Sequence, residues 1–255
     1  MNKITKYVLY DIIRNRFVLG YTLLLLAISM SFFSFESDPN KGLLSLLNII
    51  LMVVPLVSII FSTIHFYNSY EFIELMSAQP LSRKAIFLSE YMGVATSLSL
   101  AFLVGVGLPT LAFGGGESSL ILIMSGFLLT LSFVSLAFLA SVITRDKAKG
   151  IGLALVIWFY FSLVYDGLVL SILLSFNDYP LEKAMLVLTA LNPTDLARIM
   201  VLMKMDISAL MGFTGAVFQD FFSTNYGLLV AMFILMSWVV LPITIACRIF
   251  QRKDL

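Results

Sequence analysis

The chain has little charge and few of the residues on which most catalytic and metal sites depend. Of its 255 residues only 12% are charged, and it has one Cys and one His. A lone Cys247 excludes a disulfide within the chain and a Cys-x-x-Cys motif. A single His65 argues against a zinc or haem site built from His and Cys. We therefore expect no cofactor and no metal. We also expect no nucleic-acid partner.

The phosphate-binding motifs of nucleotide enzymes are also missing. The dipeptide Gly-Lys does not occur, so the sequence has no G-x-x-x-x-G-K-[ST] loop for ATP. It has no G-x-G-x-x-G after a strand, no H-E-x-x-H zinc motif and no G-x-S-x-G nucleophile turn. We therefore predict that the chain is not an enzyme and that any energy source lies in a partner.

Long apolar runs make up most of the chain, in which 60% of residues are hydrophobic. About 20 helical residues cross the roughly 30 Å hydrocarbon core, where the backbone has to satisfy its own hydrogen bonds. The first run is too long for a signal peptide and is interpreted as a retained helix. The prediction is one all-α membrane domain with six transmembrane helices, at about 17–35, 43–66, 91–113, 119–144, 151–174 and 226–247.

The basic residues are distributed unevenly between the two sides that six helices imply. If both termini share one side, that side holds 12 of the 16 Lys and Arg residues, and the other holds Lys41, Lys183, Arg198 and Lys204. The positive-inside rule then predicts cytoplasmic termini in a bacterial inner membrane. Residues 2–16 are interpreted as a basic amphipathic helix on the inner surface, with a simple basic flank as the alternative.

The longer inner connection, residues 67–90, combines a short acidic amphipathic helix, a proline stop and a basic restart. A solvated connection would not need Phe72, Ile73, Leu75 and Met76. We interpret the segment as a docking element for a cytoplasmic partner. The alternative is a helix that rests on the membrane.

The longer outer connection, residues 175–225, is too apolar for a disordered loop and predicts two or three short helices. Asn192 suits an N-cap, Pro193 the first helical position and Asp195 the positive end of the helix dipole. Several methionines gather here, either as Cu(I) ligands or, as we prefer, as packing residues. They are Met200, Met203, Met205 and Met211.

Asp166 is the only clear charge within a predicted span. Because a charge in lipid is costly, this carboxyl should face the bundle, a cavity or a partner. One interpretation is a proton or ion site, and the other is a hydrogen-bonded carboxyl that joins helices. His65, at the inner end of the second helix, is interpreted as a helix-capping residue, with pH sensing or metal binding as alternatives.

The overall pattern resembles the ABC-2 class of ABC transporter permeases. That class has six helices, an N-terminal elbow helix, a coupling helix between helices 2 and 3, and small external helices between helices 5 and 6. The resemblance implies a non-catalytic membrane subunit that forms a homodimer in the lipid and docks a cytoplasmic ATPase. The run E-x-x-E-x-x-x-x-x-P-x-S-R resembles the coupling region, with Glu71, Glu74, Pro80, Ser82 and Arg83.

A narrower resemblance rests on the run 192–198, N-P-T-D-L-A-R, together with Tyr165 and Asp166. Both are similar to the permease subunits of the Nos system, the NosY family, which works in maturation of the copper enzyme nitrous oxide reductase. The resemblance implies a periplasmic β-helix partner seated on Asn192, Pro193, Thr194, Asp195 and Arg198.

Two alternative functions remain open at this point. One is a generic ABC-2 exporter of lipid, glycan or drug. The other, from a different class, is an intramembrane ion or proton carrier that uses Asp166. The sequence does not name the transported species.

Overall fold

The computed structural model describes residues 12, 15–36, 38–77, 82–176, 182–205 and 225–252. All regular secondary structure in these residues is helical. These residues contain six helices long and apolar enough to cross a membrane, or seven spans if one sharply bent pair is counted as a span. The prediction of an all-α membrane protein with six transmembrane helices is confirmed. The six spans are Arg16–Phe35, Pro39–Asn68, Arg83–Gly114, Gly116–Ile143, Lys147–Ser175 and Tyr226–Arg252.

Side-chain caps explain where several of the helices begin. Asp38, Ser82 and Asp146 each accept a hydrogen bond from a backbone N–H in the first turn of the helix that follows. The elements in chain order are α2 (Arg16–Phe35), α3 (Pro39–Asn68), α4 (Tyr70–Ser77), α5 (Arg83–Phe102), the π-helical turns η1 (Leu103–Gly107) and η2 (Thr110–Gly114), α6 (Gly116–Ile143), α7 (Lys147–Phe159), the π-helical turn η3 (Tyr160–Val164), α8 (Tyr165–Ser175), α9 (Glu182–Ala190), α10 (Pro193–Lys204) and α12 (Asn225–Arg252).

The third span begins earlier than the sequence analysis predicted. It starts at Arg83 and not at residue 91, because Ser82 caps it and because Glu90, a charged residue, is buried inside the bundle. The last span likewise continues past Cys247 to Arg252. The amphipathic helix predicted over residues 2–16 falls almost wholly outside the described residues.

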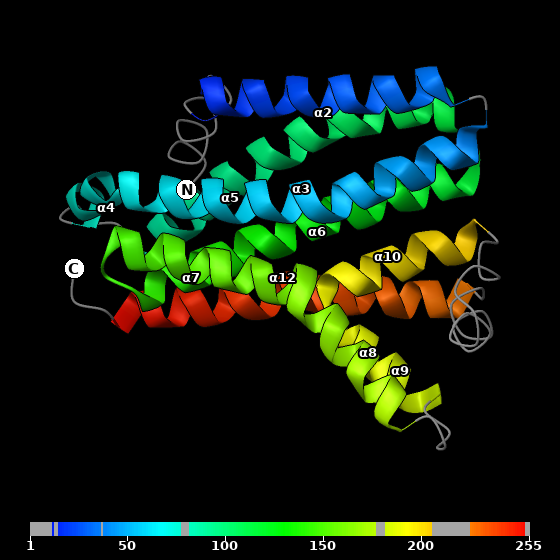
Figure 1. Ribbon diagram of the computed structural model, residues 1–255. Coiled ribbons are helices and arrows are strands. Elements are labelled where there is room, and N and C mark those ends of the chain that lie inside the picture. The colour runs from blue at the N-terminus through cyan, green and yellow to red at the C-terminus, as the bar shows by residue number, and fades with distance from the viewer. Residues whose placement is uncertain are drawn as a thin grey trace.

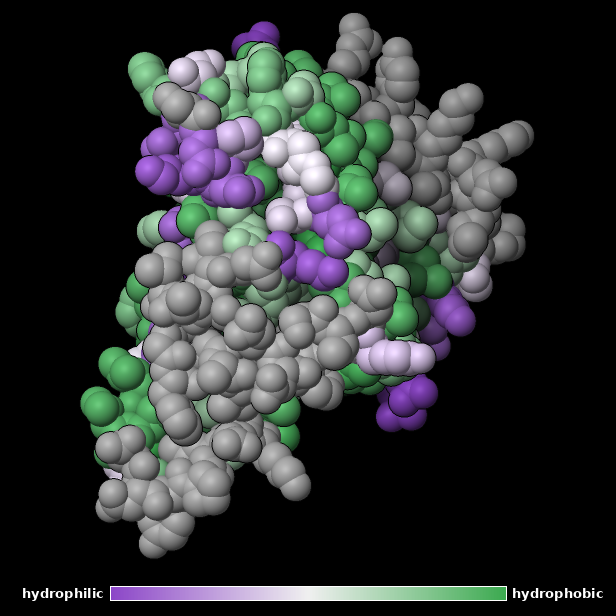
Figure 2. All heavy atoms as spheres, turned by 90° about the vertical axis from the view of Figure 1, so that its right-hand side faces the viewer, coloured by the Kyte–Doolittle hydropathy of each residue, from purple (hydrophilic) through white to green (hydrophobic). Residues whose placement is uncertain are grey.

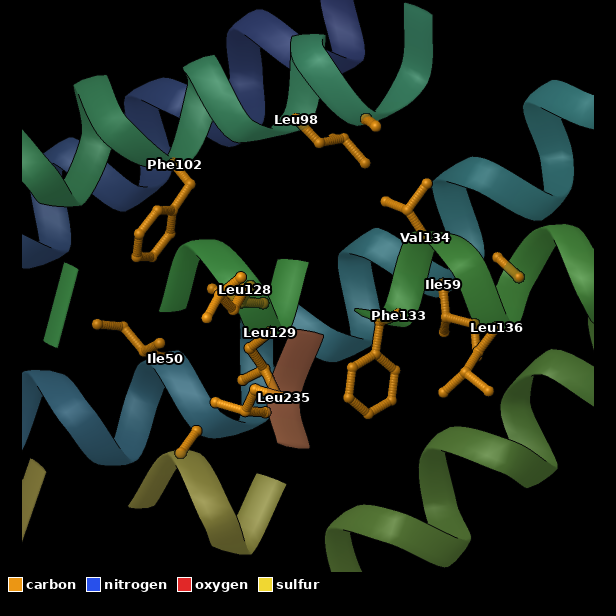
Figure 3. Close-up of a cluster of buried hydrophobic side chains, with 14 of the residues drawn as sticks. Ile50, Ile59, Leu98, Phe102, Leu128, Leu129, Phe133, Val134, Leu136 and Leu235 are labelled. Carbon is orange, nitrogen blue, oxygen red and sulfur yellow. The ribbon is translucent and has the colours of Figure 1, made fainter. Parts of the chain in front are cut away.

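Helix α6 forms the centre of the bundle and is the most buried of the six spans. It packs against α3, α12, α5, α7 and α10. Figure 3 shows the core where Ile50 of α3, Phe102 of α5, Leu129 of α6 and Leu235 of α12 converge, and all four side chains are at most 1% exposed. Such complementary packing holds helices together in lipid, where water contributes little to their association.

The two ends of the bundle differ in what they carry. The end called here the α4 end holds α4, the start of α7 and the end of α12 (Figure 1). Lys147 Nζ there donates to Asn68 Oδ1 at 2.7 Å. At the opposite end, Gly115 and Gly116 adopt φ values of 66° and 74°, which only glycine accommodates readily, and reverse the chain. Figure 2 looks onto this opposite end, where hydrophilic residues form separate patches among hydrophobic ones.

Helices α8 and α9 leave the side of the bundle as a projecting pair, while α10 returns alongside α12 (Figure 1). The axis turns by 115° between α9 and α10. In the 18-residue apolar stretch of span Lys147–Ser175, which includes α8, only 11% of the residues are buried. The corresponding share for span Pro39–Asn68 is 50%. The chain therefore leaves most of this span to be covered by lipid or by another protein surface.

Gly105 in η1 sets the distance between α2 and the third span. A Cβ at this position would lie 2.6 Å from the Cβ of Leu25 and 3.0 Å from the carbonyl oxygen of Thr22. We predict that Gly105→Ala lowers the free energy of unfolding by about 1–3 kcal/mol, since neither atom can move aside easily. Gly20→Ala is the matched control, because no atom lies within 4 Å of its Cβ. Thermal melting of the purified proteins in detergent measures both, and equal melting temperatures would contradict the prediction.

Candidate functional site

Helix α4 presents an acidic face that the rest of the chain leaves exposed. Glu71 and Glu74, three residues apart, are both exposed, whereas Ile73 between them is fully buried. Leu75 is 68% exposed on the same short helix. The buried isoleucine anchors α4 to the bundle, so that its two carboxylates and one leucine project outwards. Arg83 is also exposed, at the start of α5, and Pro80 lies outside the described residues.

Behind α4, a pair of side chains joins the end of α3 to α5. His65 Nε2 lies 3.2 Å from Glu90 Oε2, and Ser69, the C-cap residue of α3, approaches the same nitrogen at 3.3 Å. The side chain of Glu90 is only 2% exposed. Burying an ionisable pair is tolerated when each partner satisfies the other, so this contact fixes α3 and α5 where they flank α4.

Sequence reasoning did not find this pair. It interpreted His65 as a helix cap and assigned Glu90 to the connection between helices. The two residues are 25 positions apart on different helices, and no local spacing signals that they meet.

At the α9–α10 corner, Asn192 caps α10 and joins the corner to the fifth span. Its Oδ1 accepts from Thr194 N at 2.9 Å, which caps α10 as predicted, and its Nδ2 donates to the carbonyl oxygen of Phe161 at 2.9 Å. Phe161 belongs to the π-helical turn η3. Tyr165 OH donates to Leu188 O at 2.6 Å, so two side-chain hydrogen bonds tie the corner to the fifth span.

Arg198 connects two carboxyl groups beside this corner. Its Nη1 donates to Asp166 Oδ2 at 3.0 Å and to Asp195 Oδ1 at 3.2 Å. The first bond joins α8 to α10, whereas the second stays within α10. The structure thus places the charge predicted within a span next to the N-P-T-D-L-A-R run and brings the two separately recognised motifs into contact.

Asp195 is the most enclosed member of this cluster, with its side chain 14% exposed. The pKa of its carboxyl is raised to about 7, chiefly by burial and then by the nearby Asp166 carboxyl, while Arg198 and Asn192 oppose the shift. One guanidinium thus holds two acidic groups, and the raised pKa of Asp195 favours its protonated form.

Three of the five residues expected to seat an external partner are buried inside the chain. Asn192 is fully buried, Thr194 is 2% exposed and Pro193 is also buried. That these three seat an external partner stays a prediction; within the chain itself their side chains cap and pack the corner. Asp195 and Arg198 retain some exposure. The methionines of α10 are likewise enclosed, as packing residues are, with Met200 0%, Met203 3% and Met205 8% exposed.

Comparison with known proteins identifies the family. Residues 4–255 match the family described as ABC-2 family transporter protein. The chain belongs to the ABC-2 family. It is 28% identical to the probable ABC transporter permease protein NosY of Pseudomonas aeruginosa over 79% of this chain and 81% of that protein. It is also 28% identical to the protein of the same name from Stutzerimonas stutzeri, over 96% of this chain and 95% of that one.

Membership of the ABC-2 family indicates the general function of the chain. It is the permease subunit of an ABC transporter and a multi-pass membrane protein, and ATP hydrolysis belongs to an ATPase partner. The expectation that the chain is not an enzyme is confirmed by the family, which lacks ATPase activity.

The raised pKa of Asp195 predicts how stability depends on pH. The folded protein holds this proton more tightly than the unfolded chain, whose carboxyl has a pKa near 3.8. The stabilising contribution is therefore complete below that value and is lost as the pH rises towards about 7. We predict that Asp195→Asn, which cannot ionise, loses less stability than the unaltered protein between about pH 5 and about pH 8. Melting temperatures in detergent test this, and a constant difference at every pH would refute it.

Proposed function

We propose that this chain is the membrane subunit of a Nos-type ABC transporter that supports maturation of the copper site of nitrous oxide reductase. In this proposal α4 is the docking surface for the ATPase, and the α4 end faces the cytoplasm. The observation that carries the docking assignment is the exposed pair Glu71 and Glu74 on a helix anchored by the buried Ile73.

The geometry behind α4 supports its role as a docking helix. Ile73 N donates to Ser69 O at 2.9 Å, so the start of α4 is continuous with the cap of α3. The contact between His65 and Glu90 then fixes α3 to α5 on either side of α4. A force applied to α4 therefore reaches two spans at once, as transmission from an ATPase requires.

The distribution of charge supports the cytoplasmic assignment of the α4 end. Eight described basic residues lie in the segments that the sequence analysis placed on the cytoplasmic side, from the start of α2 to the end of α12. Basic residues next to helix ends favour the cytoplasmic side. They are Arg16, Arg83, Lys84, Arg145, Lys147, Lys149, Arg248 and Arg252.

The Nos-type assignment is supported by the two NosY relatives and by the meeting of two motifs. Asp166 and Arg198 come from the two motifs that resemble that family, and they form one ion pair. We further propose that a second copy covers part of the poorly buried span Lys147–Ser175. A periplasmic partner would meet the exposed parts of Asp195 and Arg198 and not the buried Asn192.

Charge reversal on α4 tests the docking assignment. We predict that Glu71→Lys with Glu74→Lys lowers recovery of the copurified ATPase at least about tenfold, since like charges facing each other cost several kcal/mol. The matched control reverses two acidic residues of the opposite end, Glu36→Lys with Glu117→Lys, and should leave ATPase recovery unchanged. Equal recovery with both double variants would mean that α4 does not dock the ATPase.

Cysteine labelling tests the proposed orientation. In a Cys247→Ser background, Glu117→Cys should react with a membrane-impermeant maleimide in intact spheroplasts, whereas Lys147→Cys should react only after permeabilisation. Both positions are exposed, so access to reagent depends on the side of the membrane. Labelling of Lys147→Cys in intact spheroplasts would reverse the assignment.

A further inference from the structure

A small cavity of about 100 Å³ lies between α3, the α7–η3 segment and α10. Its polar lining comes from Asn48, Ser162, Thr194 and Arg198. Asn48 is exposed, so the cavity reaches the surface of the bundle. The cavity is separate from α4 and the ATPase docking surface, so an account of its occupant does not depend on the proposed function.

Two hydroxyl groups of this lining have no hydrogen-bond partner among the described residues. They are Ser162 Oγ and Thr194 Oγ1, both buried. Thr194 is only 2% exposed. Within a membrane protein an unpaired buried hydroxyl is costly. Most of the buried Ser and Thr side chains in the spans avoid the cost by bonding the carbonyl four residues earlier, as Thr130 does with Gly126. Seven buried hydroxyl groups of the described residues lack a partner, and those of Ser162 and Thr194 are the two that belong to the lining of this cavity, where an occupant with hydrogen-bonding groups would pair them.

The charged side chains beside the cavity disfavour binding of an ion that carries only one sign of charge. Arg198 is already paired with Asp166 and Asp195, so the cluster has one cation and two acidic groups. A phosphate alone would meet the Asp166 carboxylate beside Arg198, and a cation alone would meet the guanidinium. A group that carries both charges fits, with its ammonium towards Asp166, which is 39% exposed, and its phosphate towards the remaining N–H donors of Arg198 and the amide of Asn48.

The surroundings of the opening indicate that such a group arrives from the lipid. Met52 and Leu163, which also line the cavity, are 55% and 51% exposed. Trp158 lines it too and donates its indole N–H to the carbonyl oxygen of Met52 at 3.3 Å. Exposed apolar side chains beside a polar cavity suit acyl chains below a head group, and tryptophan is enriched at that level of a bilayer.

The depth of the cavity in the bilayer agrees with a lipid head group that lies slightly below the hydrocarbon edge. Helix α3 has 30 residues, so it is about 45 Å long and extends about 7 Å beyond each edge of a 30 Å hydrocarbon core if centred. Asn48 is nine residues from Pro39, about 14 Å along the helix. It therefore lies about 7 Å inside the hydrocarbon edge.

We propose that this cavity binds the head group of a zwitterionic phospholipid with a primary ammonium group, that is, a phosphatidylethanolamine. The ammonium donates hydrogen bonds to Asp166 and to the free hydroxyls of Ser162 and Thr194. The phosphate accepts from Arg198 and Asn48, and the acyl chains run past Met52 and Leu163.

Native mass spectrometry of the full-length protein tests the proposal with three lipids that share the same acyl chains. Retention should be highest for phosphatidylethanolamine. It should be lower for phosphatidylcholine, whose quaternary ammonium cannot donate, and for anionic phosphatidylglycerol. Ser162→Ala with Thr194→Val should reduce ethanolamine-lipid retention about fivefold or more, by loss of two hydrogen bonds.

The control is Thr244→Val, an exposed threonine of α12 far along the chain from the cavity, which should retain the lipid normally. The cavity variant removes only hydroxyls without partners, so its melting temperature without lipid should match the unaltered protein. Equal retention of the three lipids, or tighter binding of phosphatidylglycerol, would overturn the proposal. So would equal stabilisation by soluble glycerophosphoethanolamine, or loss of dimer without loss of lipid in the cavity variant.

Discussion

Hydrocarbon offers no hydrogen-bond partner, so the polar groups inside this bundle depend on the chain itself for most of their hydrogen bonds. Most serines and threonines of α6 meet the requirement within their own helix, as Ser132 does with Leu128 O at 2.8 Å. Groups that cannot do so bond between helices, and those bonds decide which helices stay together. Tyr67, for example, joins the end of α3 to Thr144 at the end of α6.

The same requirement explains the irregular corner between α9 and α10. The carbonyl of Phe161, in a π-helical turn, receives the amide of Asn192, and Trp238 Nε1 of α12 donates to Ala190 O at 3.1 Å. The corner between α9 and α10 is therefore fixed from the fifth span and from the last one. Its polar sequence, which is unusual between apolar helices, is used inside the molecule.

The helices were predictable from the sequence, whereas most contacts between them were not. Apolar runs ended by charge located six spans, and Asn192 was identified as a cap because capping is local. The burial of Asn192, however, depends on η3, and the partner of Asp166 lies 32 residues away. Periodicity along one helix carries no information on the rotation of its neighbour. Charge also misled the analysis, since Glu90 ended a predicted loop although His65 buries it inside a span.

The π-helical turn η3 has a geometrical consequence for the residues that follow it. A π-helical turn holds one residue more than an α-helical turn, and each residue of an α-helix advances its side chain by about 100° around the axis. The five residues of η3 therefore set the direction in which Asp166 leaves the helix relative to Trp158. If the same residues formed a regular α-helix instead, the carboxylate of Asp166 would turn by most of about 100° around the axis and away from α10. In this chain a single π-helical turn thus determines the direction in which the charged side chain of Asp166 leaves its membrane-spanning helix.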